Sequence, residues 1–291
     1  MWEFVVHRSH PSVVAPADPA NRRGCYTVGV PAPTDDDHAL AARLADEAGA
    51  LLMDLRAERT ADGDFDPREL KDDGDLRSHE LLMAALAPRI EAGDAVLSEE
   101  GRDSTDRLAH ARVWIIDPLD GTREFGEPPR TDWAVHVALS IEGAPVCGAV
   151  ALPGLDRVLS TAEPPSVLDL DEVPGRPRVV VSRTRPPAAA TWVADHLDAE
   201  LVEMGSAGAK VAAVVQGLAD VYPHSGGQYE WDSCAPVAVA AAAGLVATRL
   251  DGAELRYNEP DPYLPDLLVC HRALAERSRS IIDAWLADGG R

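Results

Sequence analysis

Apolar residues in the first part of the chain recur at the spacing of helices. Between His38 and Arg59 they return every three to four positions, which predicts an amphipathic helix whose first turn can be capped by the carboxylates of residues 35–37. Residues 60–75 are polar and mostly acidic, so a solvated loop is expected there. A second helix is predicted from Ser78 to Ala87, ending near Pro88.

Two short apolar runs that end in carboxylates predict buried strands. Residues 95–97 lead into Glu99 and Glu100, and residues 113–116 lead directly into Asp117. Adjacent glutamates on a loop are usually solvated, so only their position at the end of a strand makes them candidates for function.

The clearest strand is predicted at residues 133–141, where bulky residues alternate with small or polar ones. Glu142 and Gly143 turn the chain back into residues 145–152, which completes a hairpin. His136 has the opposite parity from the bulky residues. We therefore expect it to face the second layer or solvent rather than to bind a ligand.

Beyond residue 165, prolines mark a boundary and strands begin to alternate with helices. The predicted strands are residues 179–181, 201–204, 219–222, 245–250 and 266–270, and the predicted helices are residues 187–197, 207–216, 232–243 and 274–287. This alternation is typical of α/β structure, whereas the first half is α+β with an antiparallel hairpin.

The same patterns divide the chain into three parts. Residues 1–34 are rich in Pro, Ala and Arg and have no period, which predicts a disordered extension or upstream sequence translated from a wrongly placed start. We expect residues 35–165 to form an N-terminal α+β subdomain and residues 175–288 a C-terminal α/β subdomain.

Composition narrows the classes of function. The formal charge of −22, from 49 acidic and 27 basic residues, argues against a protein that wraps nucleic acid or binds anionic membranes. A protein this acidic would need metal ions to attract phosphates. The cysteines form no CxxC pair and no zinc signature is present, so free thiols in a reducing cytosol are expected.

With no apolar run of membrane-spanning length and no secretory signal, we expect a cytoplasmic location.

Asp117 and Asp120 stand three residues apart at the end of a predicted buried strand. Pro118 has no N–H to donate, so the ladder is expected to stop there and the carbonyl of Leu119 to point the same way as the two carboxylates. A glycine and a threonine follow, where a turn into a helix would expose unpaired N–H groups. Hard oxygen ligands beside such a turn indicate a divalent cation that meets a phosphate, although Asp-Pro-x-Asp-Gly is also ordinary turn chemistry.

Glu99 and Asp232 are candidates to complete this cation site. Glu99 follows a strand, and Asp232 begins a helix, where capping alone would explain a carboxylate. Together with Asp117, Asp120 and a main-chain carbonyl, they would suit Mg²⁺ better than zinc or copper. Two such ions about 3.5–4 Å apart could activate a water and stabilise a leaving oxygen, which favours hydrolysis of a phosphate monoester.

A turn of small residues, Gly205 and Ser206, begins another predicted helix and has Lys210 one turn later. Close helix packing explains such a turn about as often as ligand binding does. If the turn faces the carboxylates, it can hold the rest of an anionic substrate.

Three segments resemble the signature segments of the inositol monophosphatase superfamily of Mg²⁺-dependent, lithium-sensitive phosphatases. They are residues 98–100 (SEE), 114–122 (WIIDPLDGT) and 230–232 (EWD), and the resemblance spans residues 38–288. Within the superfamily the chain is similar to the 3′(2′),5′-bisphosphate nucleotidases of the CysQ type. The similarity lies in residues 123–125 (REF) and the Gly205-Ser206 turn with Lys210, and the actinobacterial members are most similar through residues 132–136, 256–258 and 261–265.

The resemblance implies a layered α-β-α-β-α fold and a reaction. The reaction removes the 3′-phosphate from adenosine 3′,5′-bisphosphate, or from 3′-phosphoadenylyl sulfate, and serves sulfate assimilation. The implied cofactor is Mg²⁺, with about two or three ions per site. The implied partner is a small phosphorylated nucleotide, with no nucleic acid polymer and no membrane, and a homodimer is left open.

The resemblance also implies roles for individual residues. The implied Mg²⁺ ligands are Glu99, Asp117, the Leu119 carbonyl, Asp120 and Asp232. Gly121 and Thr122 would hold the scissile phosphate, with Thr122 also orienting the attacking water. Gly205, Ser206 and Lys210 would lie near the nucleotide.

One position departs from the family pattern. The family commonly has a Thr-x-Ala-Asp segment ahead of the second helix, whose Asp partners the motif threonine in activating water. Here residues 76–79 read LRSH, so His79 stands where that Asp would be. Either Asp75 takes over from one turn away, or His79 acts as a neutral base, or activation relies on metal and Glu99 alone. We favour Asp75; a histidine base would lose activity below about pH 6.5.

Two other functions compete with a nucleotidase. The first is the same metal mechanism with inositol 1-phosphate or fructose 1,6-bisphosphate as the main substrate. The second is a non-catalytic acidic protein that binds a structural cation or senses a nucleotide, and it predicts that Asp120→Asn leaves phosphate release unchanged.

Overall fold

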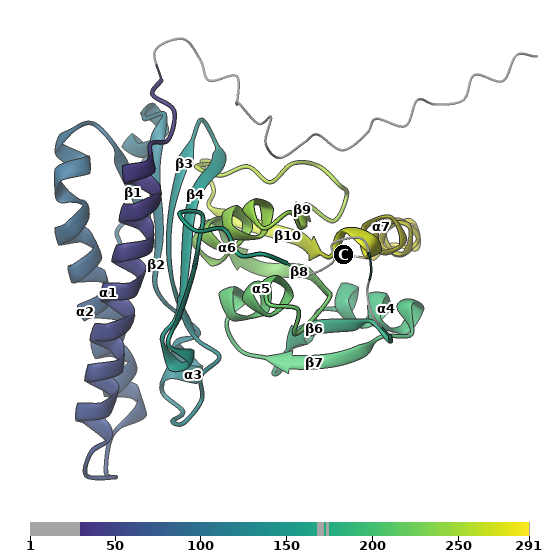
Figure 1. Cartoon of the computed structure of the whole chain (residues 1–291), viewed down its shortest axis with the longest axis horizontal. Coiled ribbons are helices and arrows are strands. Elements are labelled where there is room, and N and C mark those ends of the chain that lie inside the picture. Colours follow the sequence, from purple (N-terminus) through teal and green to yellow (C-terminus); the bar gives the residue numbers. More distant parts are fainter. Residues whose placement is uncertain (1–29, 168–171, 173–174, 291) are drawn as a thin grey trace, which may run out of the picture.

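Two long helices and a five-stranded sheet make up the first half of the chain in the computed structural model, which describes residues 30–167, 172 and 175–290 (Figure 1). Its elements are α1 Asp35–Thr60, α2 Pro67–Glu91, β1 Ala95–Ser98, a 3₁₀ helix Thr105–Ala109, β2 Arg112–Asp120, α3 Thr122–Phe125, β3 Ala134–Ile141, β4 Ala144–Leu152, a 3₁₀ helix Pro153–Leu155 and β5 Arg157–Ser160. The strand order is β1-β2-β3-β4-β5; β1 and β2 are parallel and the other neighbours are antiparallel. The predicted hairpin of β3 and β4 is confirmed.

A second five-stranded sheet and four helices follow in the described part of the second half. Their elements are β6 Arg178–Ser182, α4 Ala188–Leu197, β7 Glu200–Met204, α5 Ala207–Val215, β8 Val221–Tyr229, α6 Glu230–Ala242, β9 Val246–Thr248, β10 Tyr263–Cys270 and α7 Arg272–Ala287. The order is β7-β6-β8-β10-β9; β6 is parallel to β7 and β8, and β10 is antiparallel to β8 and β9. The predicted alternation is confirmed, although β8 begins at Val221 and runs on to Tyr229.

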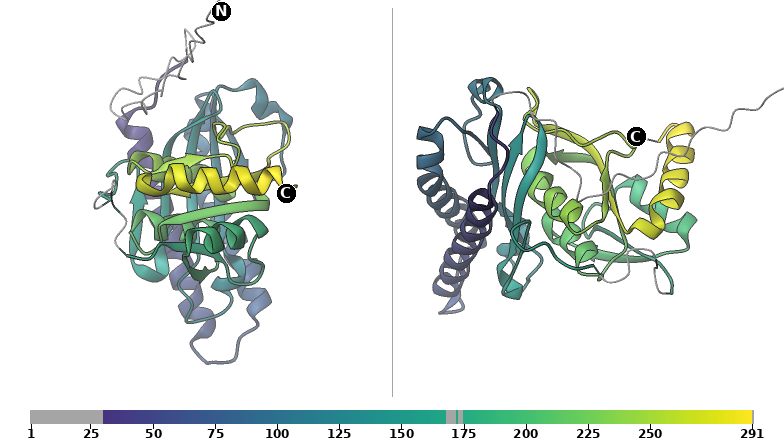
Figure 2. Two further views of the ribbon diagram at one scale, coloured as in Figure 1. Left: turned by 90° about the vertical axis from the view of Figure 1, so that its right-hand side faces the viewer. Right: turned by 45° about the horizontal axis from the view of Figure 1, so that its top comes forward.

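These elements stack as five layers (Figure 1). Helices α1 and α2 cover one face of the first sheet, α5 and α6 lie between the two sheets, and α4 and α7 cover the far face of the second sheet. Figure 2 shows α7, in yellow, lying across that outer face. The layered α-β-α-β-α arrangement is therefore confirmed. Within the described residues, no helix has the length and apolar character needed to cross a membrane.

The core between the sheets combines side chains from both halves. Val113 of the first sheet and Val180 of the second belong to the same buried cluster. The division into residues 35–165 and 175–288 stays a prediction, because the two parts share this cluster. Residues 1–29 of the predicted extension lie outside the described residues, whereas Val30 packs against the core under α1.

Helix α1 begins slightly earlier than predicted, and its cap is a threonine. Thr34 Oγ1 accepts a hydrogen bond from the Asp37 N–H at 3.2 Å, and Asp37 Oδ2 accepts one from the Thr34 N–H at 2.9 Å. This reciprocal pair satisfies two donors at the start of the helix, so Asp37 supports the cap rather than providing it alone.

Helix α2 corrects the prediction of a loop at residues 60–75 and of a helix that ends near Pro88. The helix begins at Pro67, where Asp66 Oδ1 accepts a hydrogen bond from the Arg68 N–H at 2.7 Å, and it runs past Pro88 to Glu91. Its buried positions recur every four residues. Two of these, Gly74 and Ser78, are not apolar, so the buried stripe is narrow. Of the acidic residues beside it, Asp72 is exposed, whereas Asp75 is half-buried.

Strand β2 also continues past the proline that was expected to end it. The ladder with β3 is irregular between Asp117 and Asp120, and pairing resumes where Asp120 lies opposite Ala134. The Pro118 carbonyl accepts a hydrogen bond of 2.7 Å from the buried Ser78 hydroxyl of α2. The proline thus produces a bulge, which changes the direction of the carboxylates without ending the strand.

Alternation along β3 sorts its side chains between two layers. The bulky residues, such as Val135 and Val137, pack against α1 and α2, whereas Ala134 and Ala138 face the layer of α5 and α6. His136 shares the parity of Ala134 and is completely buried. The expectation that it faces the second layer is confirmed, and exposure to solvent is excluded.

Candidate metal centre

Three carboxylates from distant parts of the sequence converge at one end of the first sheet. Asp117 and Asp120 lie at the bulged end of β2, and Asp232 lies in the first turn of α6. One oxygen from each of the three lies within 4.8 Å of the others. The structure therefore brings together the three aspartates that the sequence predicted as cation ligands.

Asp117 is the most deeply buried of the three and has no exposed surface. Its Oδ1 accepts a hydrogen bond from the Leu119 N–H at 3.0 Å, whereas its Oδ2 has no hydrogen-bond partner. Burial raises the pKa of this carboxyl well above its usual value, and the nearby charges of Glu99 and Asp120 raise it further. A buried carboxylate oxygen without a donor, among like charges, fits a cation ligand.

Asp120 is held in its charged form by donors from α5. It accepts hydrogen bonds from Ser206 Oγ at 2.5 Å, the Ala207 N–H at 3.1 Å and the Gly208 N–H at 2.6 Å. Burial alone would raise the pKa of Asp120, but His136 and these donors lower it to about 2. The N–H groups at the start of α5 thus point at a cation-ligand candidate rather than at a substrate phosphate.

Asp232 serves both as a helix cap and as a member of the cluster. Its Oδ2 accepts a hydrogen bond from the Tyr229 N–H at 2.7 Å. Burial raises the pKa of Asp232 to about 7, and the charge of Asp120 contributes to the increase. The capping explanation considered for the sequence is thus correct, and it does not exclude the carboxylate from the cluster.

Glu99 lies beside the three aspartates rather than among them. It follows β1, its N–H donates to the Ile116 carbonyl at 3.3 Å, and its side chain is exposed. Partial burial of its carboxyl raises the pKa of Glu99, while the proximity of Asp117 lowers it. Glu99 is therefore placed at the mouth of the cluster, next to Asp117.

Thr122 begins α3, immediately after Gly121, whose φ of 85° is in the left-handed region. The Thr122 hydroxyl donates to the Leu119 carbonyl at 3.1 Å and lies 3.5 Å from Asp75 Oδ1. The Leu119 carbonyl expected to bind a cation thus accepts this hydroxyl in the structure. A side chain at position 121 would meet Ser206 Cβ at 3.0 Å, so the turn requires glycine.

Of the two alternatives for the partner of Thr122, the structure places Asp75 beside it and His79 elsewhere. His79 Nδ1 lies 3.0 Å from the Ser98 hydroxyl, on the side of α2 that faces β1. Burial raises the pKa of Asp75 to about 7, and the charges of Glu100 and Glu99 add to this effect. A carboxyl with this pKa can accept or release a proton near neutral pH.

The turn of small residues before α5 is fixed by contacts with Asp132 and Glu124 and by hydrogen bonds from Lys210. The Gly205 N–H donates to Asp132 Oδ2 at 2.6 Å, and a Cβ at Gly205 would lie 2.3 Å from Glu124 Cγ. Lys210 is buried, and its ammonium donates to the carbonyls of Gly205 and Ser206, the latter at 2.7 Å. Burial lowers the pKa of Lys210. Lys210 therefore supports the turn from within, and its contact with a nucleotide stays a prediction.

His136 belongs to this site, although sequence reasoning set aside a ligand role for it. Its Nδ1 lies 3.0 Å from the Trp231 carbonyl and its Nε2 lies 3.2 Å from Asp120 Oδ2. Burial would lower the pKa of His136, but Asp120 beside it raises it above its usual value. A Cβ at Gly208 would lie 1.9 Å from Nε2, so the imidazole occupies the space that the glycine leaves. In the pairing of β2 with β3, His136 lies opposite Asp117. A sequence-based alignment of these two strands in the same register would have placed His136 in the site.

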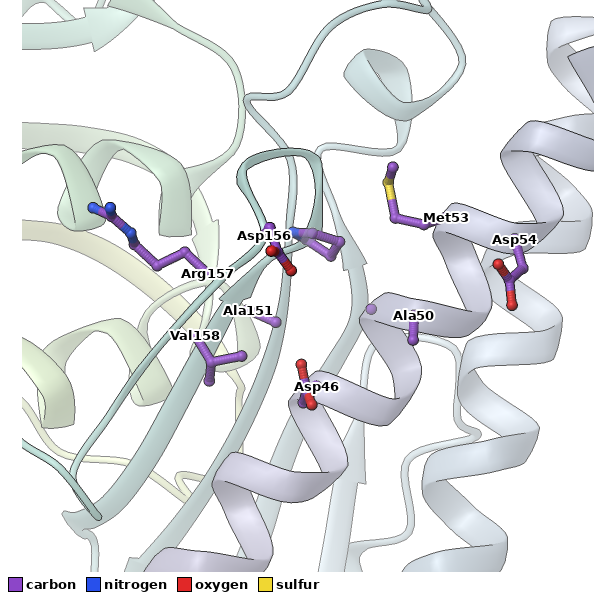
Figure 3. Close-up of a pocket in the computed structure, with 10 residues that line it drawn as sticks. Asp46, Ala50, Met53, Asp54, Ala151, Asp156, Arg157 and Val158 are labelled. Carbon is purple, nitrogen blue, oxygen red and sulfur yellow. The ribbon is translucent and has the colours of Figure 1, made fainter.

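Grooves elsewhere on the surface do not include the carboxylate cluster. One groove of 410 Å³ lies between α1 and the strands β4 and β5, with Asp46, Met53, Asp156 and Arg157 along it (Figure 3). Another, of 320 Å³, is lined by Glu230 and Tyr263 and by the segment that precedes β10. The second groove borders the first turn of α6, which carries Asp232.

Comparison with known proteins agrees with this geometry. The model of the Inositol monophosphatase family matches residues 35–166 and 175–283. A protein of Mycobacterium tuberculosis named 3′-phosphoadenosine 5′-phosphate phosphatase is 49% identical over 252 residues, which cover 82% of this chain and 91% of that protein. The Escherichia coli protein named 3′(2′),5′-bisphosphate nucleotidase CysQ is 32% identical over 203 residues, which cover 65% of this chain and 80% of that protein.

The fold is also similar to that of a solved structure from the same family. The crystal structure of CysQ from Bacteroides thetaiotaomicron, described as a bacterial member of the inositol monophosphatase family, superposes with a TM-score of 0.68 at 27% identity. The superposition covers 82% of this chain and 98% of that chain.

Proposed function

This chain belongs to the inositol monophosphatase family, and from that premise we propose that it is a 3′(2′),5′-bisphosphate nucleotidase. It removes the 3′-phosphate from adenosine 3′,5′-bisphosphate, or from 3′-phosphoadenylyl sulfate, and leaves the 5′ group in place. The observation that carries the proposal is the 49% identity to a 3′-phosphoadenosine 5′-phosphate phosphatase along 91% of that protein. A role in sulfate assimilation and a cytoplasmic location are parts of the same proposal.

The residues of the cluster fit a hard divalent cation. Three carboxylates meet within 4.8 Å, and the buried Oδ2 of Asp117 has no donor. Oxygen ligands in this arrangement suit Mg²⁺, which Asp117, Asp120 and Asp232 would hold with Glu99 and the Leu119 carbonyl at the edge. When bound, Mg²⁺ supplies a Lewis acid for the phosphoryl oxygens and lowers the pKa of a bound water.

The protein's own groups prepare the attacking water and the phosphate. The Thr122 hydroxyl lies between two acceptors, the Leu119 carbonyl at 3.1 Å and Asp75 Oδ1 at 3.5 Å, and can donate its one proton to either. When the Thr122 hydroxyl turns to donate its proton to Asp75, whose pKa is about 7, it accepts a proton from the attacking water, so the proton of the water is in effect transferred to Asp75. Gly121 lets this turn pack against Ser206 and Trp133, where a Cβ would not fit, and so holds Thr122 beside the carboxylates.

The α5 turn has a supporting role in this proposal. Ser206 and the N–H groups of Ala207 and Gly208 hold Asp120 as a carboxylate, and Lys210 holds the carbonyls of the same turn. These contacts orient Asp120 before any ligand binds, which is the condition for a preorganised cation site.

A substrate panel tests the proposal. Phosphate release is measured from adenosine 3′,5′-bisphosphate, inositol 1-phosphate and fructose 1,6-bisphosphate, each with Mg²⁺ and with added lithium. We expect the highest kcat/KM for the nucleotide, inhibition by lithium, and loss of release in Asp120→Asn. A higher kcat/KM for either of the other substrates would replace the nucleotidase by a sugar-phosphate phosphatase, and an active Asp120→Asn variant would refute the mechanism.

A further inference from the structure

We propose that Tyr229, Trp231 and Tyr263 form an aromatic platform that stacks on the purine base of the substrate. This inference rests on the proposed function, and it assigns recognition of the base to residues outside the cation site. It makes Tyr229 and Tyr263 specificity-determining residues for nucleotides over other phosphate monoesters.

The three rings are packed together although they come from three elements. The rings of Tyr229, at the end of β8, and Trp231, at the start of α6, are stacked with centroids 4.9 Å apart and planes 7° apart. Tyr263, at the start of β10, lies opposite Tyr229 in the sheet, and its ring meets that of Tyr229 edge to face at 5.8 Å and 81°. This geometry fixes the planes of the rings before any ligand arrives.

Two of the three rings of the platform are exposed, unlike the other large rings in the described part of the chain. Tyr229 is 42% exposed and Tyr263 is 41% exposed, whereas Trp231 is partly buried against the core between the sheets. Within residues 30–167, 172 and 175–290, these two tyrosines are the only aromatic side chains among the exposed large apolar residues. Exposed aromatic rings that are already aligned are a common feature of surfaces that bind flat ligands.

The platform is attached directly to the carboxylate cluster. The N–H of Tyr229 donates to Asp232 Oδ2 at 2.7 Å, and the carbonyl of Trp231 lies 3.0 Å from His136 Nδ1. The backbone that carries the two stacked rings is therefore the backbone that positions one carboxylate of the cation site.

Open space lies beside the platform. Gly226 and Gly227 precede it with φ values of 78° and 81°. A Cβ at Gly227 would meet no atom within 4 Å, and one at Gly226 would meet only the Tyr263 hydroxyl, at 3.9 Å. The Gly227 N–H donates to this hydroxyl at 3.1 Å, which holds the Tyr263 ring at the edge of the space.

The chemistry of the substrate matches this arrangement. In a nucleoside 3′,5′-bisphosphate the scissile phosphate and the base are both attached to the ribose, so a base-binding surface must lie close to the cation site without being part of it. The face of a purine stacks on aromatic rings irrespective of its exocyclic groups. Inositol has no such face, so the platform discriminates between the two classes of substrate.

The test compares a nucleotide with its abasic analogue in the Mg²⁺-loaded full chain. We measure kcat/KM for adenosine 3′,5′-bisphosphate and for ribose 3,5-bisphosphate in wild type, Tyr229→Leu, Tyr263→Leu and Tyr229→Phe. The leucine variants should lower the preference for the nucleotide by about five- to a hundredfold, the range expected for one base–aromatic stack, and the effect should lie in KM. Tyr229→Phe keeps the ring and should keep the preference. Leu201→Ala, an exposed apolar residue of β7, is the matched surface control.

The outcomes separate this inference from the proposed function. If wild type prefers the nucleotide and the leucine variants keep that preference, base recognition by the platform is wrong and the nucleotidase stands. If the leucine variants lose activity on both substrates equally, the tyrosines act on the cation site and the inference is again wrong. If wild type prefers inositol 1-phosphate, the proposed function fails. The platform is then tested by inhibition with AMP against ribose 5-phosphate, where equal inhibition constants would overturn it.

Discussion

Replacing Asp117 with asparagine should stabilise the metal-free protein and abolish its stabilisation by Mg²⁺. Asp117 is fully buried among carboxylates, with an oxygen that no donor contacts. Asparagine keeps the acceptor that receives the Leu119 N–H and places an NH₂ group where the unpartnered Oδ2 lies. That group can donate to the neighbouring carboxylates instead of repelling them.

The distances in the cluster give the size of the effect. At a separation of 4.8 Å two unit charges repel by about 3.5 kcal/mol when the effective dielectric constant is 20. The raised pKa of Asp117 and the proximity of His136 relieve part of this repulsion. We therefore expect Asp117→Asn to gain about 2 kcal/mol without metal, or roughly 3–4 °C in Tm for a protein of this size.

With Mg²⁺ present, the wild type should be more stable than the Asp117→Asn variant. A cation at about 100 times its Kd stabilises the wild type by about 2.7 kcal/mol, whereas the variant lacks a ligand and should gain little. Differential scanning calorimetry at pH 7.5, with EDTA and with a series of Mg²⁺ concentrations, measures both effects. A variant whose Tm still rises with Mg²⁺ as in wild type, or falls below it in EDTA, would contradict the assignment of Asp117.

Asp94 provides a matched control at the other end of the same sheet. It is also buried, but its Oδ1 accepts from Arg112 Nε at 2.9 Å and its Oδ2 from Trp114 Nε1 at 2.9 Å. Asp94→Asn removes the charge of a carboxylate that contacts Arg112 and Trp114, and among the described residues only Asp37, at 3.1 Å, still pairs with Arg112, so its Tm should fall. Its increase in Tm with Mg²⁺ should equal that of wild type.

Three further results are expected. Asp75→Asn should lower kcat about a hundredfold, whereas His79→Gln should change kcat by less than about threefold, since only Asp75 lies beside the reactive hydroxyl; the reverse order in steady-state assays would assign the role to the histidine. Gly208→Ala should destabilise by about 1–3 kcal/mol in urea unfolding, because its Cβ would lie 1.9 Å from His136 Nε2; helix propensity alone predicts stabilisation, so the sign decides. Burial lowers the pKa of His224 from 6.5 to about 4, so the unfolded chain binds more protons between these values, and the free energy of unfolding should fall by about 3 kcal/mol from pH 6.5 to pH 4. His224→Gln should remove that part of the pH dependence; a variant with the same slope would show that this histidine is not its source.

Much of the fold could be predicted because many of its helices and strands show a regular spacing of apolar residues in the sequence. The hairpin of β3 and β4 and the alternating elements of the second half have clear apolar patterns with turn residues between them. Helix α2 does not. Its buried face includes Gly74 and Ser78, whose burial depends on contacts with other elements rather than on their own hydrophobicity. Ser78 binds the Pro118 carbonyl, and a contact across 40 residues has no local signal in the sequence.

The candidate site was predicted where a residue type and its position at the end of an element coincide. Asp117, Asp120 and Asp232 are of this kind. His136 was missed because parity places a side chain in a layer but does not say which neighbours it has there. Lys210 shows the same limit, since a lysine near a small-residue turn can point to a ligand or back into its own helix. The geometry of the α5 turn decides between the two directions.

The convergence of the carboxylates has a consequence for the order of folding. Asp117 and Asp120 enter the site with the first sheet, whereas Asp232 arrives only when α6 packs against that sheet. The repulsion between Asp232 and the other two carboxylates is therefore absent from the first half alone, and it opposes the packing of α6 against the first sheet. A divalent cation bound by the three carboxylates would offset this repulsion, so the ions proposed for the reaction would also favour the packing of α6 against the first sheet.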